Sequence, residues 1–257
     1  MKGNNIQYAS EIFSCEQKDK FAVLTLQEQA FEITTDLQVR KDYFSVLEAV
    51  EHSPEVLGLV QINSTEHGAQ KHLEFLKSVR GGGIDIKSRP PEFLKRFTHS
   101  IDQITLKFAN YTKPLIAGIN GVSGLEYLGY TLAFDFRIAT PNTSFMLPNL
   151  SLGLPPSGPL VFNLVRYLGP GKASEIIFSG QQPLSASEAQ KLGLITSVVS
   201  EDELEQRCLE KLEELSAFPS IALSATRRMI QPEPAEIELF LRKSFDGVWA
   251  ALMQMNK

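Results

Sequence analysis

One segment of this chain, residues 113–139, constrains the fold more than any other. It reads Lys-Pro-Leu-Ile-Ala-Gly-Ile-Asn-Gly-Val-Ser-Gly-Leu-Glu-Tyr-Leu-Gly-Tyr-Thr-Leu-Ala-Phe-Asp-Phe-Arg-Ile-Ala. A β-rich apolar run is followed by a turn that contains glycines, a helical stretch and a second apolar run. Glycine is used where the backbone must bend sharply or approach another group closely. The segment therefore predicts a strand, a glycine turn, a helix and a second strand.

The preceding sequence predicts further alternation of strands and helices. Phe21–Leu26 is β-rich, apolar residues recur at helical spacing over residues 36–51, and residues 56–62 are a short apolar run typical of a buried parallel strand. These three stretches predict a β-α-β crossover, with Asp36 capping its helix. Such alternation indicates an α/β core.

Further helices are predicted on both sides of the glycine segment. They cover residues 67–79, 91–109 and 159–168, and the last is expected to stop at Gly169-Pro170-Gly171. The end of the chain changes character, because residues 201–217, 221–230 and 235–252 are amphipathic and separated by breaks that contain proline. We expect a core domain over residues 1–200 and a helical C-terminal region over residues 201–257.

Composition excludes several classes of protein. The two cysteines and four histidines show no disulfide framework and no ligand-spaced pair, so no metal site is expected. The N-terminus lacks the apolar run of a signal peptide, and no stretch approaches the roughly 20 apolar residues that cross a bilayer. A net charge of −5 argues against a broad nucleic-acid surface. We therefore expect a cytoplasmic protein that binds neither membrane nor nucleic acid.

Several separate stretches, in order, resemble the crotonase (enoyl-CoA hydratase/isomerase) family and together cover most of residues 21–231. They are Phe21–Leu26, Phe134-Asp135-Phe136-Arg137-Ile138-Ala139, Phe145-Met146-Leu147-Pro148-Asn149-Leu150-Ser151-Leu152-Gly153, residues 184–195 and Ala225-Thr226-Arg227-Arg228. The resemblance implies a β-β-α superhelix with a helical C-terminal region that caps the core or forms trimers. It also implies homotrimers or dimers of trimers, and acyl-CoA thioester substrates, with coenzyme A as part of the substrate and no tightly bound cofactor.

The resemblance assigns a pair of backbone donors to a thioester enolate oxygen. The family's triple glycine aligns with Leu125, Glu126 and Tyr127, so the Glu126 amide is the expected second donor. The first donor has two registers. Gly82-Gly83-Ile84-Asp85-Ile86-Lys87 resembles the family's Ala-Gly-Ala-Asp-Ile-Lys loop and would use the Ile84 amide, whereas His67-Gly68-Ala69 would use the Ala69 amide. We favour the Ile84 register because it preserves the residue types and the following helix. Residues expected to contact coenzyme A are Ala30, Gly83, Asp85 and Ile86.

The positions of the two hydratase glutamates hold other residues here. They align with Gly129 and Asn149, and neither residue transfers protons as a carboxylate does. Standard hydration of a 2-enoyl-CoA is therefore not expected. Asn149 either orients a water or a carbonyl, or caps its loop. Ser157, at another acidic position of the family, either binds a substrate oxygen or caps the next helix, and the Glu126 side chain is a candidate base.

Three functions follow from this pattern. The first is an enzyme that acts on an acyl-CoA or acyl-carrier thioester as an isomerase, lyase or hydrolase through a stabilised enolate. The second is a non-catalytic thioester-binding or scaffold homologue. A hydrolase with Ser157 or Ser123 as nucleophile is disfavoured because no serine–histidine pair is discernible. His67, His72 and His99 are given no role, and the acyl group stays open.

Overall fold

The computed structural model describes residues 5–63, 69–80, 92–156, 158–179 and 182–255. Within these residues, one sheet has the strand order β1-β2-β3-β4-β5-β7-β10 and a second has the order β6-β8-β9. The strands are β1 (Gln7–Ala9), β2 (Phe13–Lys18), β3 (Phe21–Leu26), β4 (Gly58–Asn63), β5 (Leu115–Ile119), β6 (Val122–Gly124), β7 (Phe136–Ala139), β8 (Ser144–Met146), β9 (Leu184–Ser185) and β10 (Ser197–Val198). The first three pair antiparallel, and β3, β4, β5, β7 and β10 pair parallel.

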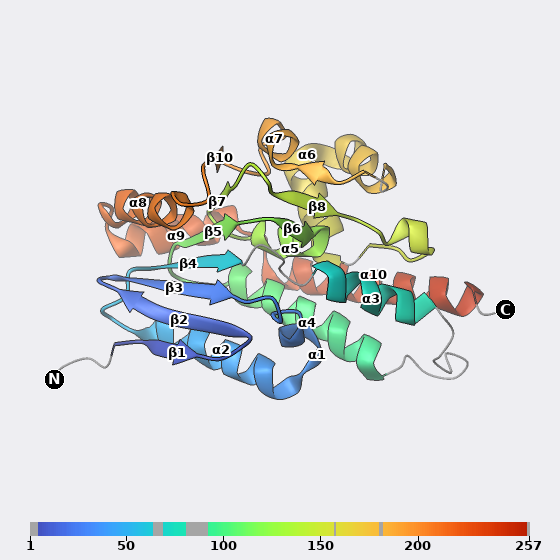
Figure 1. The fold of residues 1–257 in the computed structure, drawn as a ribbon, viewed down its shortest axis with the longest axis horizontal. Helices are drawn as coiled ribbons and strands as arrows, with labels where there is room; N and C mark the ends of the chain where they lie inside the picture. Colours follow the sequence, from blue (N-terminus) through green and yellow to red (C-terminus); the bar gives the residue numbers. More distant parts are fainter. Residues whose placement is uncertain (1–4, 64–68, 81–91, 157, 180–181, 256–257) are drawn as a thin grey trace.

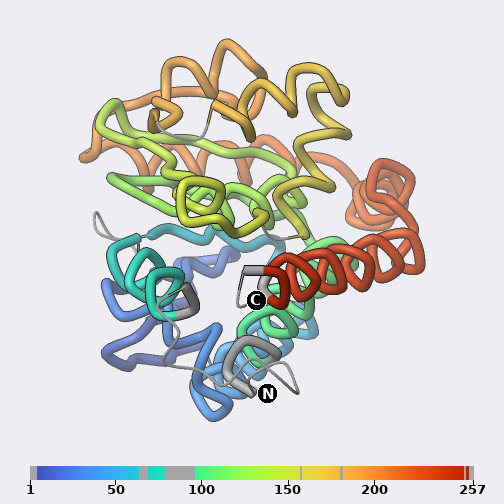
Figure 2. Tube along the Cα trace, turned by 90° about the vertical axis from the view of Figure 1, so that its right-hand side faces the viewer, coloured from blue at the N-terminus to red at the C-terminus, as the bar shows by residue number. Residues whose placement is uncertain are grey.

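Helices connect these strands and cover both faces of the large sheet (Figure 1). They are α1 (Glu32–Thr35), α2 (Leu37–His52), α3 (Ala69–Arg80), α4 (Glu92–Ala109), α5 (Leu125–Thr131), the 3-10 helix η1 (Leu150–Leu152), α6 (Gly158–Phe178), α7 (Ala186–Lys191), α8 (Leu204–Ser216), α9 (Ser220–Ile230) and α10 (Pro234–Met255). In Figure 2 the α10 helix runs alongside α4 on one side of the molecule.

The predicted β-α-β crossover at the start of the chain is confirmed. Strands β3 and β4 pair parallel, and α2 joins them. The Asp36 carboxylate accepts from the Gln38 amide at 2.8 Å and the Val39 amide at 2.9 Å, which satisfies two of the amides that a helix start leaves without an acceptor. The Asp36 cap therefore fixes where α2 begins. The apolar face of α2 fixes which side of the helix packs against the core.

Alternate residues of β3 face different layers, as expected for a strand buried on both sides. Leu24 belongs to the main core with Leu47 of α2 and Phe108 of α4. Val23 belongs to a second cluster with Cys208 and neighbouring residues of α8. The large sheet is thus a layer between α2 and α4 on one face and α8 on the other (Figure 1).

The helix predicted over residues 159–168 is followed directly by a second helix that was not predicted. The predicted stop at Gly169 is confirmed, because its φ of 74° and ψ of 164° are not helical, and a second helix begins at Pro170 and runs to Phe178. Only glycine adopts this backbone conformation readily, and proline is well suited to the first turn of the helix that follows. In α10, Phe240 packs against Phe162 at a ring-centroid distance of 5.2 Å. The division at residue 200 stays a prediction.

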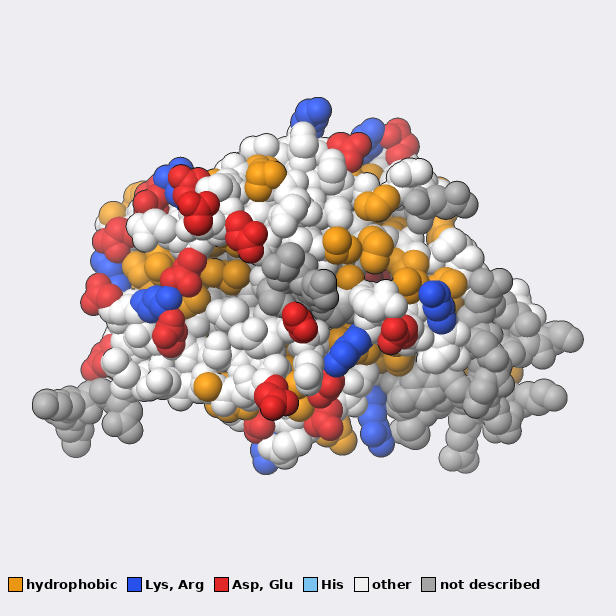
Figure 3. Space-filling view, in the orientation of Figure 1, with side chains coloured by type: hydrophobic (Ala, Val, Ile, Leu, Met, Phe, Trp, Pro, Cys, Tyr) orange, Lys and Arg blue, Asp and Glu red, His pale blue; other side chains and the backbone are white. Residues whose placement is uncertain are grey.

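Charges of both signs are interspersed over the face drawn in Figure 3, notably at the end where α8 lies. Exposed pairs on α8 such as Arg207–Glu210 and Lys211–Glu214 contribute little to stability, so the apolar stripe of the helix holds it on the sheet. Among the residues that the structure describes, none of the helices combines the length and apolar character needed to span a bilayer.

Candidate active site

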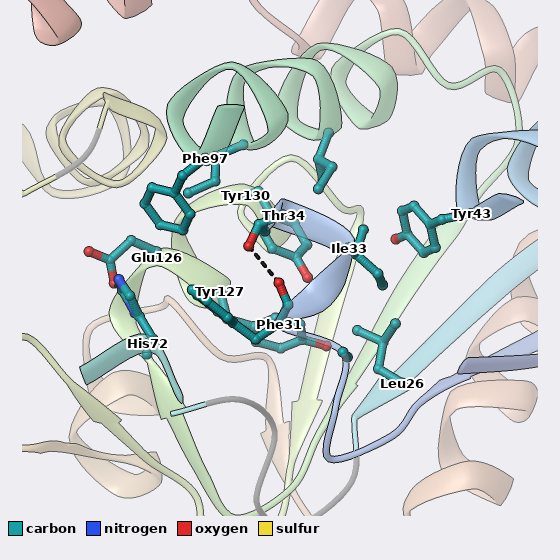
Figure 4. Close-up of a pocket in the computed structure, with 14 residues that line it drawn as sticks. Leu26, Phe31, Ile33, Thr34, Tyr43, His72, Phe97, Glu126, Tyr127 and Tyr130 are labelled. Carbon is teal, nitrogen blue, oxygen red and sulfur yellow. Dashed lines mark hydrogen bonds and ion pairs between the residues drawn. The ribbon is translucent and has the colours of Figure 1, made fainter. Parts of the chain in front are cut away.

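The glycine turn between β6 and α5 forms part of the wall of an internal pocket (Figure 4). Helices α1, α3, α4 and α5 surround it. The lining residues are mostly apolar or aromatic: Leu26, Ala30, Phe31, Ile33, Thr34, Tyr43, His72, Phe97, Ile101, Ile104, Gly124, Glu126, Tyr127 and Tyr130. Its cavity of about 70 Å³ has room for several water molecules, since one water needs roughly 10–15 Å³ on this scale, or for a short acyl chain.

The three residues that stand in place of the triple glycine face different surroundings. Gly124 has extended backbone before α5 and offers no side-chain cap to its first amides. Leu125 joins the hydrophobic core, whereas Glu126 and Tyr127 line the pocket. The first amides of a helix have no acceptor inside the helix, so the start of α5 presents N–H donors. The Glu126 amide is one of these donors.

A buried carboxylate and a buried imidazole lie together in this wall. Glu126 Oε2 is 3.4 Å from His72 Nδ1, and the side chains are 7% and 8% exposed. Within the described part of the chain, neither oxygen of Glu126 nor Nε2 of His72 has a hydrogen-bond partner. Buried polar atoms are nearly always hydrogen-bonded, to protein or to water. The arrangement therefore leaves hydrogen-bonding capacity for a guest in the pocket.

Aromatic rings fix the position of His72. Its ring stacks on Phe31 at a centroid distance of 5.8 Å and lies 5.7 Å from Phe97. The absence of a side chain at Gly124 makes room for the imidazole, because a Cβ there would lie 2.9 Å from His72 Nδ1. The observed position of the imidazole thus depends on a glycine at the last residue of β6.

Tyrosines form the other end of the pocket. Tyr43 Oη donates to Gln61 Oε1 at 2.5 Å, and Gln61 Nε2 donates to Tyr130 Oη at 3.5 Å. Burial raises the pKa of Tyr43, of Tyr127 and of Tyr130 well above the ordinary tyrosine value. These hydroxyls stay neutral, so Glu126 and His72 are the acid–base groups of the described lining.

Of the two candidate residues for the first backbone donor, the structure describes Ala69 and does not describe Ile84. Residues 81–91 lie outside the described residues, and with them Gly83, Ile84, Asp85 and Ile86. Ala69 opens α3, which packs against β6, and His72 lies one helical turn further on. Ala69 therefore begins a helix that packs beside the glycine turn. The use of the Ile84 amide stays a prediction.

Of the other predicted site residues, Ala30 lies in the pocket wall, and its contact with coenzyme A stays a prediction. Asn149 is buried but does not line this pocket. Its Nδ2 donates to the Pro155 carbonyl at 3.4 Å, and its Oδ1 has no partner among the described residues. Ser157 lies outside the described residues, and the buried Ser123 hydroxyl likewise has no partner among those described.

Gly129, predicted to stand where the hydratases have their first glutamate, leaves no space for a side chain. A Cβ on Gly129 would lie 2.8 Å from both the amide nitrogen and the Cα of Leu160, which is closer than real side chains come. Helix α6 therefore packs directly on the backbone of α5 at this point. The structure gives a steric reason why this residue is glycine.

Sequence reasoning missed His72, to which it gave no role, and the aromatic residues that enclose it. The signal for His72 was its place one turn after Ala69, which matters only if a helix starts there and faces the glycine turn. The contact between His72 and Gly124 joins residues 52 positions apart along the chain, so no local sequence pattern reveals it. For metals, no group of three suitable ligands occurs in the portion of the chain that is described.

Comparison with known proteins decides the family. The model of the family described as enoyl-CoA hydratase/isomerase matches residues 77–237, more than half of the chain. The chain belongs to the enoyl-CoA hydratase/isomerase family. The α/β fold class is confirmed by solved structures of this crotonase-type family. The enoyl-CoA hydratase from Bacillus halodurans superposes with a TM-score of 0.77 at 20% identity, covering 94% of this chain and 95% of that chain.

Other relatives give the same picture. A probable enoyl-CoA hydratase/isomerase from Mycobacterium abscessus has a TM-score of 0.70 at 21% identity, over 95% of this chain and 89% of that chain. The carnitinyl-CoA dehydratase of Salmonella typhi is 32% identical over 117 residues. This match covers 46% of the present chain and 44% of the relative. The matched part is thus less than half of this curated family member.

Proposed function

We propose that this family member is an enzyme that acts on an acyl-CoA or acyl-carrier thioester, removing an α-proton and holding the resulting enolate. The observation that carries the proposal is the buried Glu126 carboxylate in the pocket wall, on the first turn of α5. A general base must lie within hydrogen-bond reach of the proton it takes. Glu126 supplies a buried carboxylate in the lining of the pocket, whereas the residues that align with the hydratase glutamates in the resemblance are Gly129 and Asn149.

Backbone amides at the same turn would stabilise the enolate oxygen. The first amides of α5, that of Glu126 included, are donors without acceptors inside the helix. Preorganised donors in a pocket that excludes water stabilise developing negative charge strongly. The Ala69 amide at the start of α3 is the better supported partner, because α3 packs beside β6. The Ile84 amide is the other candidate.

The relatives agree with a thioester substrate. The carnitinyl-CoA dehydratase of Salmonella typhi is named for a CoA thioester, and the family is named for enoyl-CoA. The small cavity favours a short acyl group. We propose coenzyme A as part of the substrate and a homotrimer or dimer of trimers as the assembly.

A non-catalytic thioester-binding homologue is the second candidate, and one observation favours it. Gly129, which aligns with the first hydratase glutamate in the resemblance, is packed against Leu160 and leaves no space for a larger side chain. In that case the protein would bind thioesters and leave their α-protons untouched.

One pair of measurements separates the two. Thermal shift with CoA, acetyl-CoA and crotonyl-CoA detects binding, because a ligand of the folded state raises its apparent stability. Exchange of the α-hydrogens of butyryl-CoA in D₂O, followed by mass spectrometry, then detects the base. The enzyme predicts binding and exchange, and the scaffold predicts binding alone. The absence of both would contradict both functions.

A further inference from the structure

His72 has chemistry that the proposed base alone does not use. Its Nδ1 faces Glu126 Oε2 at 3.4 Å, and its Nε2 is buried with no partner among the described residues. An imidazole with one nitrogen on a carboxylate and the other unpartnered can exchange a proton with a bound molecule. The oxygens of Glu126 are likewise without hydrogen-bond partners in the described structure.

The surroundings hold this imidazole in place and isolate it from other charges. Phe31 and Phe97 both contact the ring, and Gly124 leaves the space it occupies. The neighbouring Lys71 is outside the lining and pairs with Glu32 at 3.2 Å. Among the described lining residues, Glu126 is therefore the charged partner that His72 meets.

We propose that His72 is a second catalytic residue of this pocket, the acid that gives a proton to the substrate while Glu126 takes one from the α-carbon. The proposal rests on the proposed function. The dyad starts as a carboxylate and an imidazolium. The Cα–H bond breaks, its proton goes to Glu126, and its electron pair passes into the enolate.

The enolate then collapses as His72 Nε2–H gives its proton to a second substrate atom. In a β,γ-unsaturated thioester that atom is Cγ, and the double bond moves to Cα–Cβ. In a β-hydroxyacyl thioester it is the hydroxyl oxygen, the Cβ–O bond breaks, and water leaves. Loss of a proton from Glu126 to water and gain of one by His72 from water restore the starting state.

This assignment separates two reactions that can be measured on the full-length protein. Solvent exchange of the α-hydrogens of butyryl-CoA needs the base alone. Conversion of 3-butenoyl-CoA or 3-hydroxybutyryl-CoA to crotonyl-CoA needs the acid as well. His72→Phe keeps an aromatic ring in contact with Phe31 and Phe97 and removes the ring nitrogen that would give the proton. His99→Phe, at an exposed histidine outside this pocket, is the matched control.

We expect His72→Phe to bind butyryl-CoA with the wild-type thermal shift, to retain α-exchange within a few-fold, and to lose crotonyl-CoA formation by roughly a hundredfold. His99→Phe should resemble wild type in all three. An equal loss of exchange and conversion in His72→Phe would show a structural role and overturn the proposal, as would wild-type conversion by that variant. Wild-type protein that exchanges but converts neither probe also overturns it and leaves the proposed function standing. Glu126→Gln with undiminished exchange would instead contradict the proposed function.

Discussion

At the scale of single residues, the Glu126 carboxylate and the His72 imidazole form a buried pair in the wall of the pocket. The alignment of Gly129 and Asn149 with the two hydratase glutamates stays a prediction; in the structure Gly129 packs on Leu160 and Asn149 donates to the Pro155 carbonyl. The Glu126 side chain was a candidate from its position alone. Its pairing with His72 could not be predicted, because the contact depends on how α3 packs against β6.

Gly129 gives a prediction at this scale. In Gly129→Ala the new methyl group would meet Leu160 backbone at 2.8 Å, so α5 and α6 must move apart. Overpacking of this kind costs about 1–3 kcal/mol, and urea unfolding measures it. Gly247→Ala in α10 is the matched control, because a Cβ there meets nothing within 4 Å. We expect it to gain roughly 0.5–1 kcal/mol from helix propensity. A Gly129→Ala protein as stable as wild type would contradict the packing argument.

At the scale of elements, periodicity and capping predicted most helices and strands of the core. Residues 36–51 and 91–109 correspond to α2 and α4, with their ends within one residue. The stop at Gly169 is confirmed, but the second helix from Pro170 was not predicted, because a glycine followed by proline reads equally as a final end or as a break between two helices. Local sequence does not distinguish these two outcomes, because they depend on how the chain packs on both sides of Gly169.

The attachment of α9 is a second prediction. Arg227 donates through Nε to both carboxylate oxygens of Asp135 at 2.9 Å, and through its other nitrogens to the carbonyls of Tyr111, Phe108 and Ala133. Arg227→Met would remove the cation that pairs with the partly buried Asp135 carboxylate, which keeps the Leu115 amide as a donor, and would remove the guanidinium donor to the Tyr111 carbonyl. We expect a loss of about 3 kcal/mol in the free energy of unfolding.

The neighbouring exposed Arg228 provides the control for this loss. Arg228→Met removes the same charge from the same helix and should change stability by less than about 0.5 kcal/mol. Equal effects of the two substitutions in urea unfolding would show that Arg227 does not anchor α9.

At the scale of the whole molecule, stability should depend on pH through a groove between α4 and α10. Asp102 lines this groove with Arg96, Glu238 and Arg242, and burial raises the pKa of its carboxyl to about 7. The folded protein then keeps a proton that the unfolded chain releases above its ordinary pKa of 3.8. The stability of the fold therefore falls as the pH rises from about 4 to about 7.

Asp102→Asn removes this titration. We expect the variant to match wild type near pH 4 and to exceed it by about 2 kcal/mol at pH 8, allowing for partial exposure of the side chain. Urea unfolding of both proteins across this range gives the difference. A difference that does not change with pH would contradict the assignment.

The central claim is that Glu126 is the base of a thioester pocket, and α-hydrogen exchange of butyryl-CoA in D₂O tests it most directly. We predict exchange by the wild-type protein, and a loss of roughly a hundredfold or more in Glu126→Gln, with the thermal shift by butyryl-CoA retained. Equal exchange by the two proteins would contradict the claim.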